Sequence, residues 1–150
     1  MDTRIALKTE IDAPIAQVFE AFSDVSSAAR NVSTIGHIEL LSPHSQGVGT
    51  RWRETRKMFG KSASEELEIT RLEPEHCFLV EAESHGAAYT TRYDFVPDGE
   101  HRTAVSILFV ARPVSLTARL FSLVSVFFRR ADRKAFVRDL ADMKEACERR

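Results

Sequence analysis

The pattern of apolar and polar positions predicts a strand, a helical stretch, a long run of strands and a final helix. In residues 3–11, apolar or threonine side chains alternate with mostly charged ones. This two-residue period predicts a strand with one covered face. Asp12-Ala13-Pro14 then predicts a helix start, because proline at the first helical position loses no hydrogen bond. The apolar stripe of that helix is formed by Ile15, Val18, Phe19 and Phe22. The polar run 23–27 ends or bends this helix, and a second short helix is predicted around residues 28–32.

Between residues 35 and 112 the helical period disappears, and the chain predicts an antiparallel meander of strands. Turn-forming residues punctuate this part of the chain at 43–49, Gly60, 74–75, Gly86 and 97–99. Clear alternation at 78–83 and 89–95 indicates strands with one solvated and one covered face.

After Pro113 the helical period returns and predicts a long C-terminal helix. The apolar positions recur three, four and seven residues apart, at Leu116, Leu120, Leu123, Val124 and Phe127, and again at Phe136, Val137, Leu140 and Met143. This helix is the only predicted element long enough to cover the apolar face of the meander. A single helix of about 10 Å diameter cannot fill the concave side of a bent sheet of roughly six or seven strands. The sequence therefore predicts an internal cavity.

Length and composition indicate one globular domain over residues 1–150. The chain has 43% hydrophobic and 29% charged residues, which argues against disordered and low-complexity classes. Its net charge of -1 lacks the positive balance that non-specific nucleic-acid binding requires, so no nucleic-acid partner is expected. The five histidines show no metal-ligand spacing, and no metal or cofactor is expected.

The chain shows no pattern of a secreted or membrane-spanning protein. Its longest apolar stretch, 114–128, is interrupted by Arg119 and is shorter than the roughly 20 residues that a transmembrane helix needs. The first residues lack a signal-peptide pattern, and Cys77 and Cys147 do not call for an oxidising compartment. We therefore expect a cytoplasmic location.

Several short motifs accompany this order of elements, namely residues 11–14, Val18-Phe19, Ser23-Asp24, 47–51, Ile69-Thr70, Glu73-Pro74 and 140–144. With them the chain resembles the START-like (SRPBCC) helix-grip superfamily, in particular its polyketide cyclase/dehydrase-like branch. The resemblance implies an α+β helix-grip fold, with a curved antiparallel sheet of six or seven strands wrapped around a long C-terminal helix and two short helices after the first strand. It also implies a cavity for a hydrophobic ligand, used in the superfamily for lipid or sterol carriage, for polyketide cyclisation or for protein partners.

Three residues of one predicted strand stand out as a candidate site. Trp52, Glu54 and Arg56 share one strand face, so an inward Trp52 places both charges inside as well. Glu54 and Arg56 could orient the polar end of a ligand, or they could form an ion pair at the cavity rim. The rest of the predicted ligand wall consists of Phe78, Val80, Tyr89, Tyr93, Phe109, Leu120 and Val124.

Binding of a small hydrophobic or aromatic ligand is the leading hypothesis, and two alternatives remain open. The first is a cyclase or dehydratase-type enzyme without a cofactor, in which Glu54, His37 or a tyrosine transfers a proton. For His37 a surface or capped position is preferred over a place in the cavity. No catalytic residue is assigned. The second is an interaction module in which the apolar helix face at 121–128 forms a homodimer or docks on a membrane.

Overall fold

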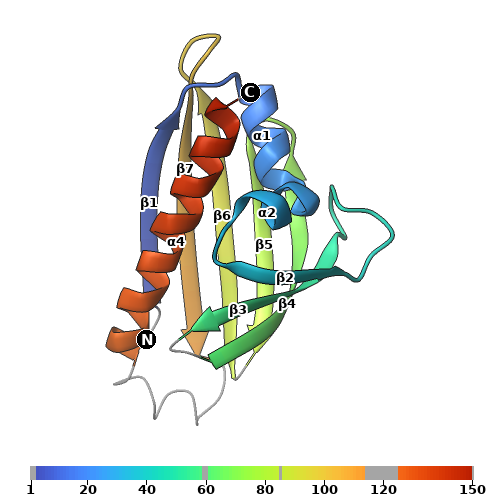
Figure 1. Ribbon diagram of the computed structural model, residues 1–150, viewed down its shortest axis with the longest axis vertical. Helices are drawn as coiled ribbons and strands as arrows, with labels where there is room; N and C mark the ends of the chain where they lie inside the picture. Colours follow the sequence, from blue (N-terminus) through green and yellow to red (C-terminus); the bar gives the residue numbers. More distant parts are fainter. Residues whose placement is uncertain (1–2, 59–60, 85, 114–124, 150) are drawn as a thin grey trace.

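Seven strands form one sheet, and three helices lie on its concave side, in the part of the chain that the structure describes (Figure 1). The computed structural model describes residues 3–149 except for 59–60, 85 and 114–124. The elements in chain order are β1 (Thr3–Ile11), α1 (Ile15–Ser23), α2 (Val25–Asn31), β2 (Ile35–Leu40), β3 (Arg51–Met58), β4 (Lys61–Glu73), β5 (Cys77–Ser84), β6 (Ala87–Pro97), β7 (Thr103–Pro113) and α4 (Ser125–Glu148). The predicted α+β helix-grip architecture is confirmed.

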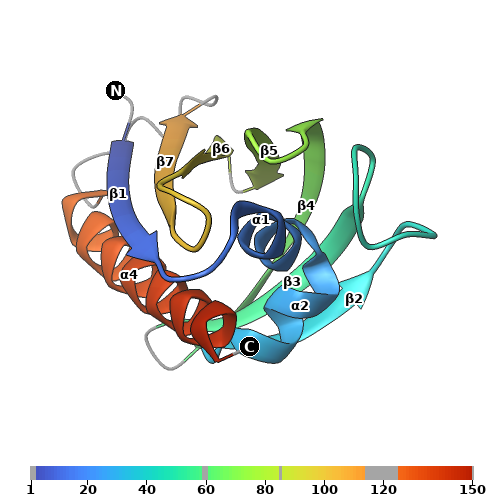
Figure 2. The ribbon, with the colours of Figure 1, turned by 90° about the horizontal axis from the view of Figure 1, so that it is seen from above.

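The strands from β2 to β7 form the predicted antiparallel meander, and β1 pairs with β7 as the edge strand beside it. The order across the sheet is β1-β7-β6-β5-β4-β3-β2. Irregular pairing between Ile35 and His37 in β2, and between Ile69 and Arg71 in β4, marks two bulges. Bulges bend a strand and increase its twist, and the sheet curves around the helices as Figure 2 shows.

The two short helices follow β1 directly, and the second begins earlier than the sequence pattern predicted. Asp24 caps α2, because its carboxylate accepts a hydrogen bond of 2.9 Å from the backbone N–H of Ser26. The polar run 23–27 therefore contains the end of α1, a capping residue and the first turn of α2 instead of a simple break. α2 spans Val25–Asn31, where residues 28–32 were expected.

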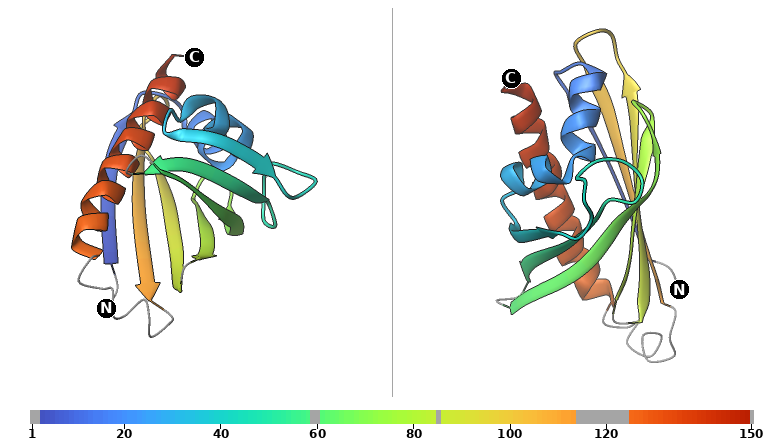
Figure 3. Two further views of the ribbon diagram at one scale, coloured as in Figure 1. Left: turned by 60° about the horizontal axis from the view of Figure 1, so that its bottom comes forward. Right: turned by 90° about the vertical axis from the view of Figure 1, so that its right-hand side faces the viewer.

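Helix α4 runs beside β1 on the concave side and comes close to α1 and α2 (Figure 3). Its covered stripe includes Leu140, Met143 and Cys147, which are buried. Val137, predicted to belong to this stripe, is half exposed, because it lies one position beyond the stripe that Phe136 and Leu140 define. None of the helices in the described ranges is both long enough and apolar enough to cross a membrane.

Polar contacts fasten α4 to the N-terminal part of the chain. The carboxylate of Asp142 accepts hydrogen bonds from the backbone N–H of Ser33 at 2.9 Å and from its hydroxyl at 2.7 Å. Closer to the C-terminus, Lys144 donates to the carbonyl oxygen of Glu10, and Gln17 donates to that of Cys147. These contacts fix the helix over the concave side of the sheet.

Replacing Asp142 by alanine should lower the free energy of unfolding by about 1 to 2 kcal/mol near neutral pH, since two hydrogen bonds to a charged group are lost. Partial burial works against the ionised form, but the Ser33 hydrogen bonds and Arg138 hold the pKa of Asp142 below its usual range. A lowered folded-state pKa contributes stability above the unfolded pKa, and this stability is lost as the pH falls through the folded value. Denaturant titrations should therefore show the two proteins converging in acid.

Glu145, exposed on the same helix, provides the control for Asp142. Its replacement by alanine should change stability by no more than about 0.5 kcal/mol. Equal losses for the two variants would contradict a specific role for the Ser33 contact.

Candidate functional site

Alternate side chains of β3 to β6 point to the concave side of the sheet, and their burial changes along the strands. The register places Trp52 opposite Leu67, Leu67 opposite Ala82 and Ala82 opposite Tyr89. Toward the end beside α1 these inner side chains are fully buried, as for Ile69, Phe78 and Phe95. Toward the other end the inward side chains keep part of their surface exposed, at Glu54, Arg56, Leu67, Ala82 and Tyr89, and so does Tyr93, which lies opposite Phe78.

Two aromatic clusters line this inner face. In the first, Phe78 stacks on Tyr93 with ring centroids 4.5 Å apart, and Phe19 and Phe22 of α1 meet these rings and Phe95 edge-on. In the second, Phe109 of β7 lies 5.9 Å from Tyr89 and 5.0 Å from Phe136 of α4. The first cluster ties α1 to the sheet, and the second ties α4 to it.

A polar cluster joins the inner face of β3 to α4. The guanidinium of Arg56 donates from Nε to Glu54 Oε2 at 2.7 Å and from Nη1 to Asp139 Oδ2 at 2.8 Å. The hydroxyl of Thr34 accepts from Arg56 Nη1 at 2.8 Å and donates to Asp139 Oδ1 at 2.5 Å. The side chains of Arg56, Glu54 and Asp139 are only 24%, 15% and 18% exposed. We call Thr34, Glu54, Arg56 and Asp139 the inner polar cluster.

The electrostatics of this cluster follow from its burial and its opposite charges. Burial works against the charged form of Arg56, but Glu54 and Asp139 outweigh it and raise the pKa of Arg56. Burial raises the pKa of Asp139, against the opposing effects of Arg56 and Thr34. Burial also raises the pKa of Tyr93, and the negative charges of Asp139 and Glu54 add to that effect. Tyr93 therefore presents a neutral phenol near an ionic cluster.

The structure brings together most of the residues proposed from the sequence. Trp52, Glu54 and Arg56 lie on one inner face, as their spacing predicted, and the indole N–H of Trp52 donates to Glu54 Oε1 at 3.4 Å. The two charges are paired with each other, which matches the ion-pair alternative. The remaining predicted wall positions that the structure describes also face inward, at Phe78, Val80, Tyr89, Tyr93 and Phe109. Leu120 and Val124 lie outside the described residues, and the side chains of 121–128 are not described either.

His37, proposed as a cavity base, is placed on the opposite side of the sheet. It is exposed on the edge strand β2 and pairs with Thr55. Thr55 lies between Glu54 and Arg56 in sequence, so it points to the outer face. The bulge at Gly36 shifts the register here, which simple alternation along β2 could not anticipate.

Sequence reasoning missed Asp139 and Thr34. A signal for Asp139 was present, because it lies three residues after Phe136 and four before Met143, inside the apolar stripe of the last helix. A carboxylate at such a position requires a partner on the facing surface, and Arg56 supplies it. Thr34 lies in the short link between α2 and β2 and carried no comparable signal.

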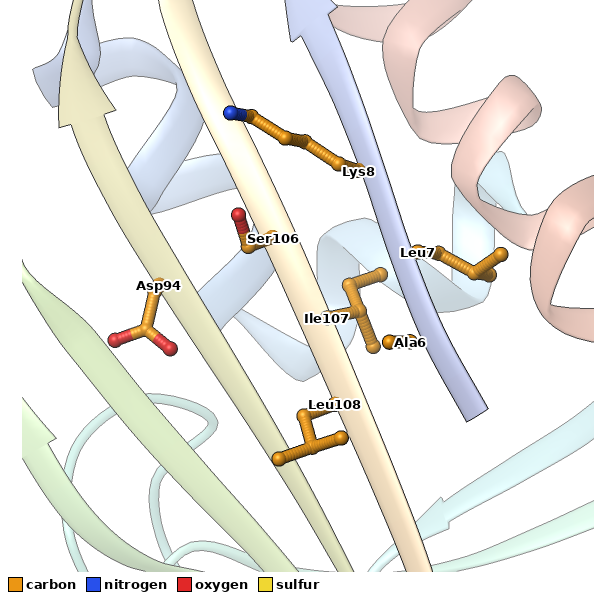
Figure 4. A pocket seen from close by; sticks show the side chains of 7 residues that line it. All are labelled: Ala6, Leu7, Lys8, Asp94, Ser106, Ile107 and Leu108. Carbon is orange, nitrogen blue, oxygen red and sulfur yellow. The ribbon is translucent and has the colours of Figure 1, made fainter. Parts of the chain in front are cut away.

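A separate depression lies on the outer face of the sheet, over β1, β7 and β6 (Figure 4). Its polar lining consists of Lys8, Ser106 and Asp94, and Figure 4 shows Leu7 pointing away from it toward α4. Arg92 forms an ion pair with Asp94, in which Nε lies 2.9 Å from Oδ2. None of these polar residues belongs to the inner polar cluster, so the depression is a distinct feature of the outer surface.

Comparison with solved structures finds the same fold in proteins of low sequence identity. The aromatase/cyclase ZhuI from Streptomyces sp. R1128 is 14% identical, with a TM-score of 0.80 over 100% of this chain and 96% of that one. TTHA0849 from Thermus thermophilus is 16% identical, with a TM-score of 0.79 over 95% of each chain. The di-domain ARO/CYC BexL from the BE-7585A biosynthetic pathway is 17% identical, with a TM-score of 0.76 over 99% of this chain and 51% of that one.

At these identities the likeness concerns the fold alone. A search of curated proteins found none that matches this chain. A family profile, by contrast, covers residues 2–148, which is nearly the whole sequence, and its description is polyketide cyclase/dehydrase and lipid transport. The chain therefore belongs to the polyketide cyclase/dehydrase and lipid transport family, as its element order and short motifs had suggested.

Proposed function

We propose that this protein binds a small apolar or aromatic molecule in a hollow between the inner face of β3–β6 and α4. The observation that carries this proposal is the change of burial along the inner face. Ala82, Tyr89 and Tyr93 face inward, yet they remain partly exposed, whereas Phe78 and Phe95 beside them are fully covered. Protein interiors are otherwise close-packed, so partial exposure at inward positions supports room for a guest.

The walls of this hollow have the composition of a ligand site. Tyr89, Tyr93, Phe109 and Phe136 supply apolar surface, and the inner polar cluster supplies a few polar groups at one place. The neighbouring inward side chains of Trp52, Phe78 and Val80 are buried. Burial of about 300 Å² of apolar ligand surface contributes roughly 7 kcal/mol, against an association cost of the order of 4 to 15 kcal/mol. Useful affinity therefore depends on a preformed hollow with polar contacts.

A neutral fluorescent probe, N-phenyl-1-naphthylamine, tests this proposal. We expect saturable binding with micromolar affinity and one molecule per chain, because the proposal places a single hollow between the sheet and α4. Fluorescence titration measures the affinity, and native mass spectrometry measures the stoichiometry and detects any small molecule retained from expression. Non-saturable fluorescence with no bound species in the mass spectrum would contradict the proposal.

A cyclase or dehydratase activity in the same hollow is the second candidate. Two observations favour it, namely the carboxylates of Glu54 and Asp139 beside the neutral phenol of Tyr93, and the fold shared with aromatase/cyclases. Such groups could transfer protons to a folded polyketide-like substrate. This candidate differs from simple binding in one measurable respect, because a new product must form from the bound molecule: an isomer after cyclisation alone, or a molecule lighter by one water after dehydration.

A further inference from the structure

The inner polar cluster holds one cation between two anions. Arg56 lies 2.7 Å from Glu54 and 2.8 Å from Asp139, and all three side chains are largely shielded from solvent. With Arg56 charged and both carboxylates ionised, the three groups sum to -1. The guanidinium charge is therefore already compensated, and one negative charge remains on the wall of the proposed hollow.

The hydrogen-bond capacity of the cluster also favours a ligand group that donates hydrogen bonds. Two carboxylates offer about eight lone-pair sites, and the described contacts occupy four of them, through Arg56 twice, Thr34 and Trp52. Spare donors are fewer, since Arg56 has only its Nη2 group without a hydrogen bond among the described residues. A ligand anion at Nη2 would also approach Glu54 and Asp139. The cluster is therefore better suited to accept hydrogen bonds than to donate them.

Among the side chains that the structure describes, the surroundings of the cluster do not reverse this balance. Tyr93 adds no charge, because burial and the adjacent carboxylates raise its pKa, and its neutral hydroxyl can both donate and accept a hydrogen bond. The register places Glu65 on the same face of β4, directly opposite Glu54, where it takes part in an interaction of its own. The neighbouring arginines of β3, Arg51 and Arg53, point to the outer face and pair there with Glu66.

We propose that the inner polar cluster selects ligands by head group: it accepts an aromatic molecule carrying a hydroxyl or ammonium donor and discriminates against a carboxylate. This inference rests on the proposed function, because it concerns the polar end of a molecule in that hollow. The donor group would hydrogen-bond to the free lone pairs of Glu54 and Asp139, while the ring would lie against the aromatic wall. A fatty acid or aromatic acid would meet net repulsion at the same place.

Three probes with the same ring and different head groups test the selection. They are 2-(hydroxymethyl)naphthalene, 2-(aminomethyl)naphthalene and 2-naphthoate, each titrated at neutral pH against protein loaded with N-phenyl-1-naphthylamine. We expect the alcohol and the ammonium to displace the dye at concentrations at least about tenfold lower than the carboxylate, as an uncompensated charge at short range in a partly buried site requires. Carboxylate binding equal to or tighter than that of the alcohol would overturn the inference.

Charge-neutralising variants of the same size complete the experiment. Glu54→Gln and Asp139→Asn each remove one negative charge, so each should reduce the discrimination against 2-naphthoate about tenfold. Glu66→Gln removes a charge from the exposed outer face and should leave the discrimination unchanged. An equal effect of all three variants would assign the preference to overall charge and overturn the inference. If the neutral dye itself fails to bind, the proposed function fails, whereas dye binding with unselective probes contradicts the head-group selection alone.

Discussion

Replacing Arg56 by leucine is expected to lower the free energy of unfolding by about 3 kcal/mol, because it leaves two largely buried carboxylates without their cation. Glu54 and Asp139 both lose their ion pair, and Thr34 loses a hydrogen-bond donor at its hydroxyl. The loss should appear in chemical denaturation as a lower midpoint with an unchanged slope. Since Asp139 lies on α4, the effect measures how strongly the cluster holds this helix against the sheet.

Arg53 is the matched control, three residues earlier on the same strand. It also forms two ion pairs, with Glu39 at 2.9 Å and Glu66 at 2.7 Å, but its side chain is 44% exposed on the outer face. Exposed ion pairs are screened by water and contribute little to stability, so Arg53→Leu should change the midpoint little. If both leucine variants lose the same stability, the cluster is no more than a surface network and does not fasten α4.

The sheet was predictable because its period is strict. Turn residues between apolar runs predicted a meander of roughly six or seven strands, and alternation in residues 3–11, 78–83 and 89–95 predicted the face that each side chain takes within these runs. Helix boundaries were less predictable, since the polar run 23–27 contains both a helix end and the capping Asp24 of the next helix. The bulge in β2 moved His37 to the outer face, and bulges leave no period in a sequence.

The candidate site was predictable only where it lies within one element. Trp52, Glu54 and Arg56 are spaced two apart on a strand, so their common inward face followed directly from the alternation. Asp139 meets Arg56 from a helix 83 residues away in sequence, and that meeting depends on how α4 is placed over the sheet. A carboxylate in an apolar stripe signals that a partner exists, but the identity of the partner is a tertiary property.

Replacing Ala82 by phenylalanine should abolish dye binding and leave stability nearly unchanged. Ala82 faces inward between Leu67 and Tyr89, and it is one of the inner positions that remain partly exposed. A phenyl ring there would occupy the proposed hollow and make apolar contacts with Tyr89, instead of displacing packed side chains. We expect the affinity for N-phenyl-1-naphthylamine to fall at least about a hundredfold, which corresponds to roughly 2.7 kcal/mol, and the unfolding midpoint to stay the same or rise.

Val80 supplies the contrast, because it lies two residues earlier on the same strand and face but is only 7% exposed. Val80→Phe inserts a ring where the core is already filled, and such overpacking costs about 1 to 3 kcal/mol. The two variants thus distinguish a hollow from a closed core within one strand. Equal destabilisation by Ala82→Phe and Val80→Phe would mean that protein side chains already fill the space beside Ala82. An internal ligand would then have no room in this protein, whatever the family to which the chain belongs.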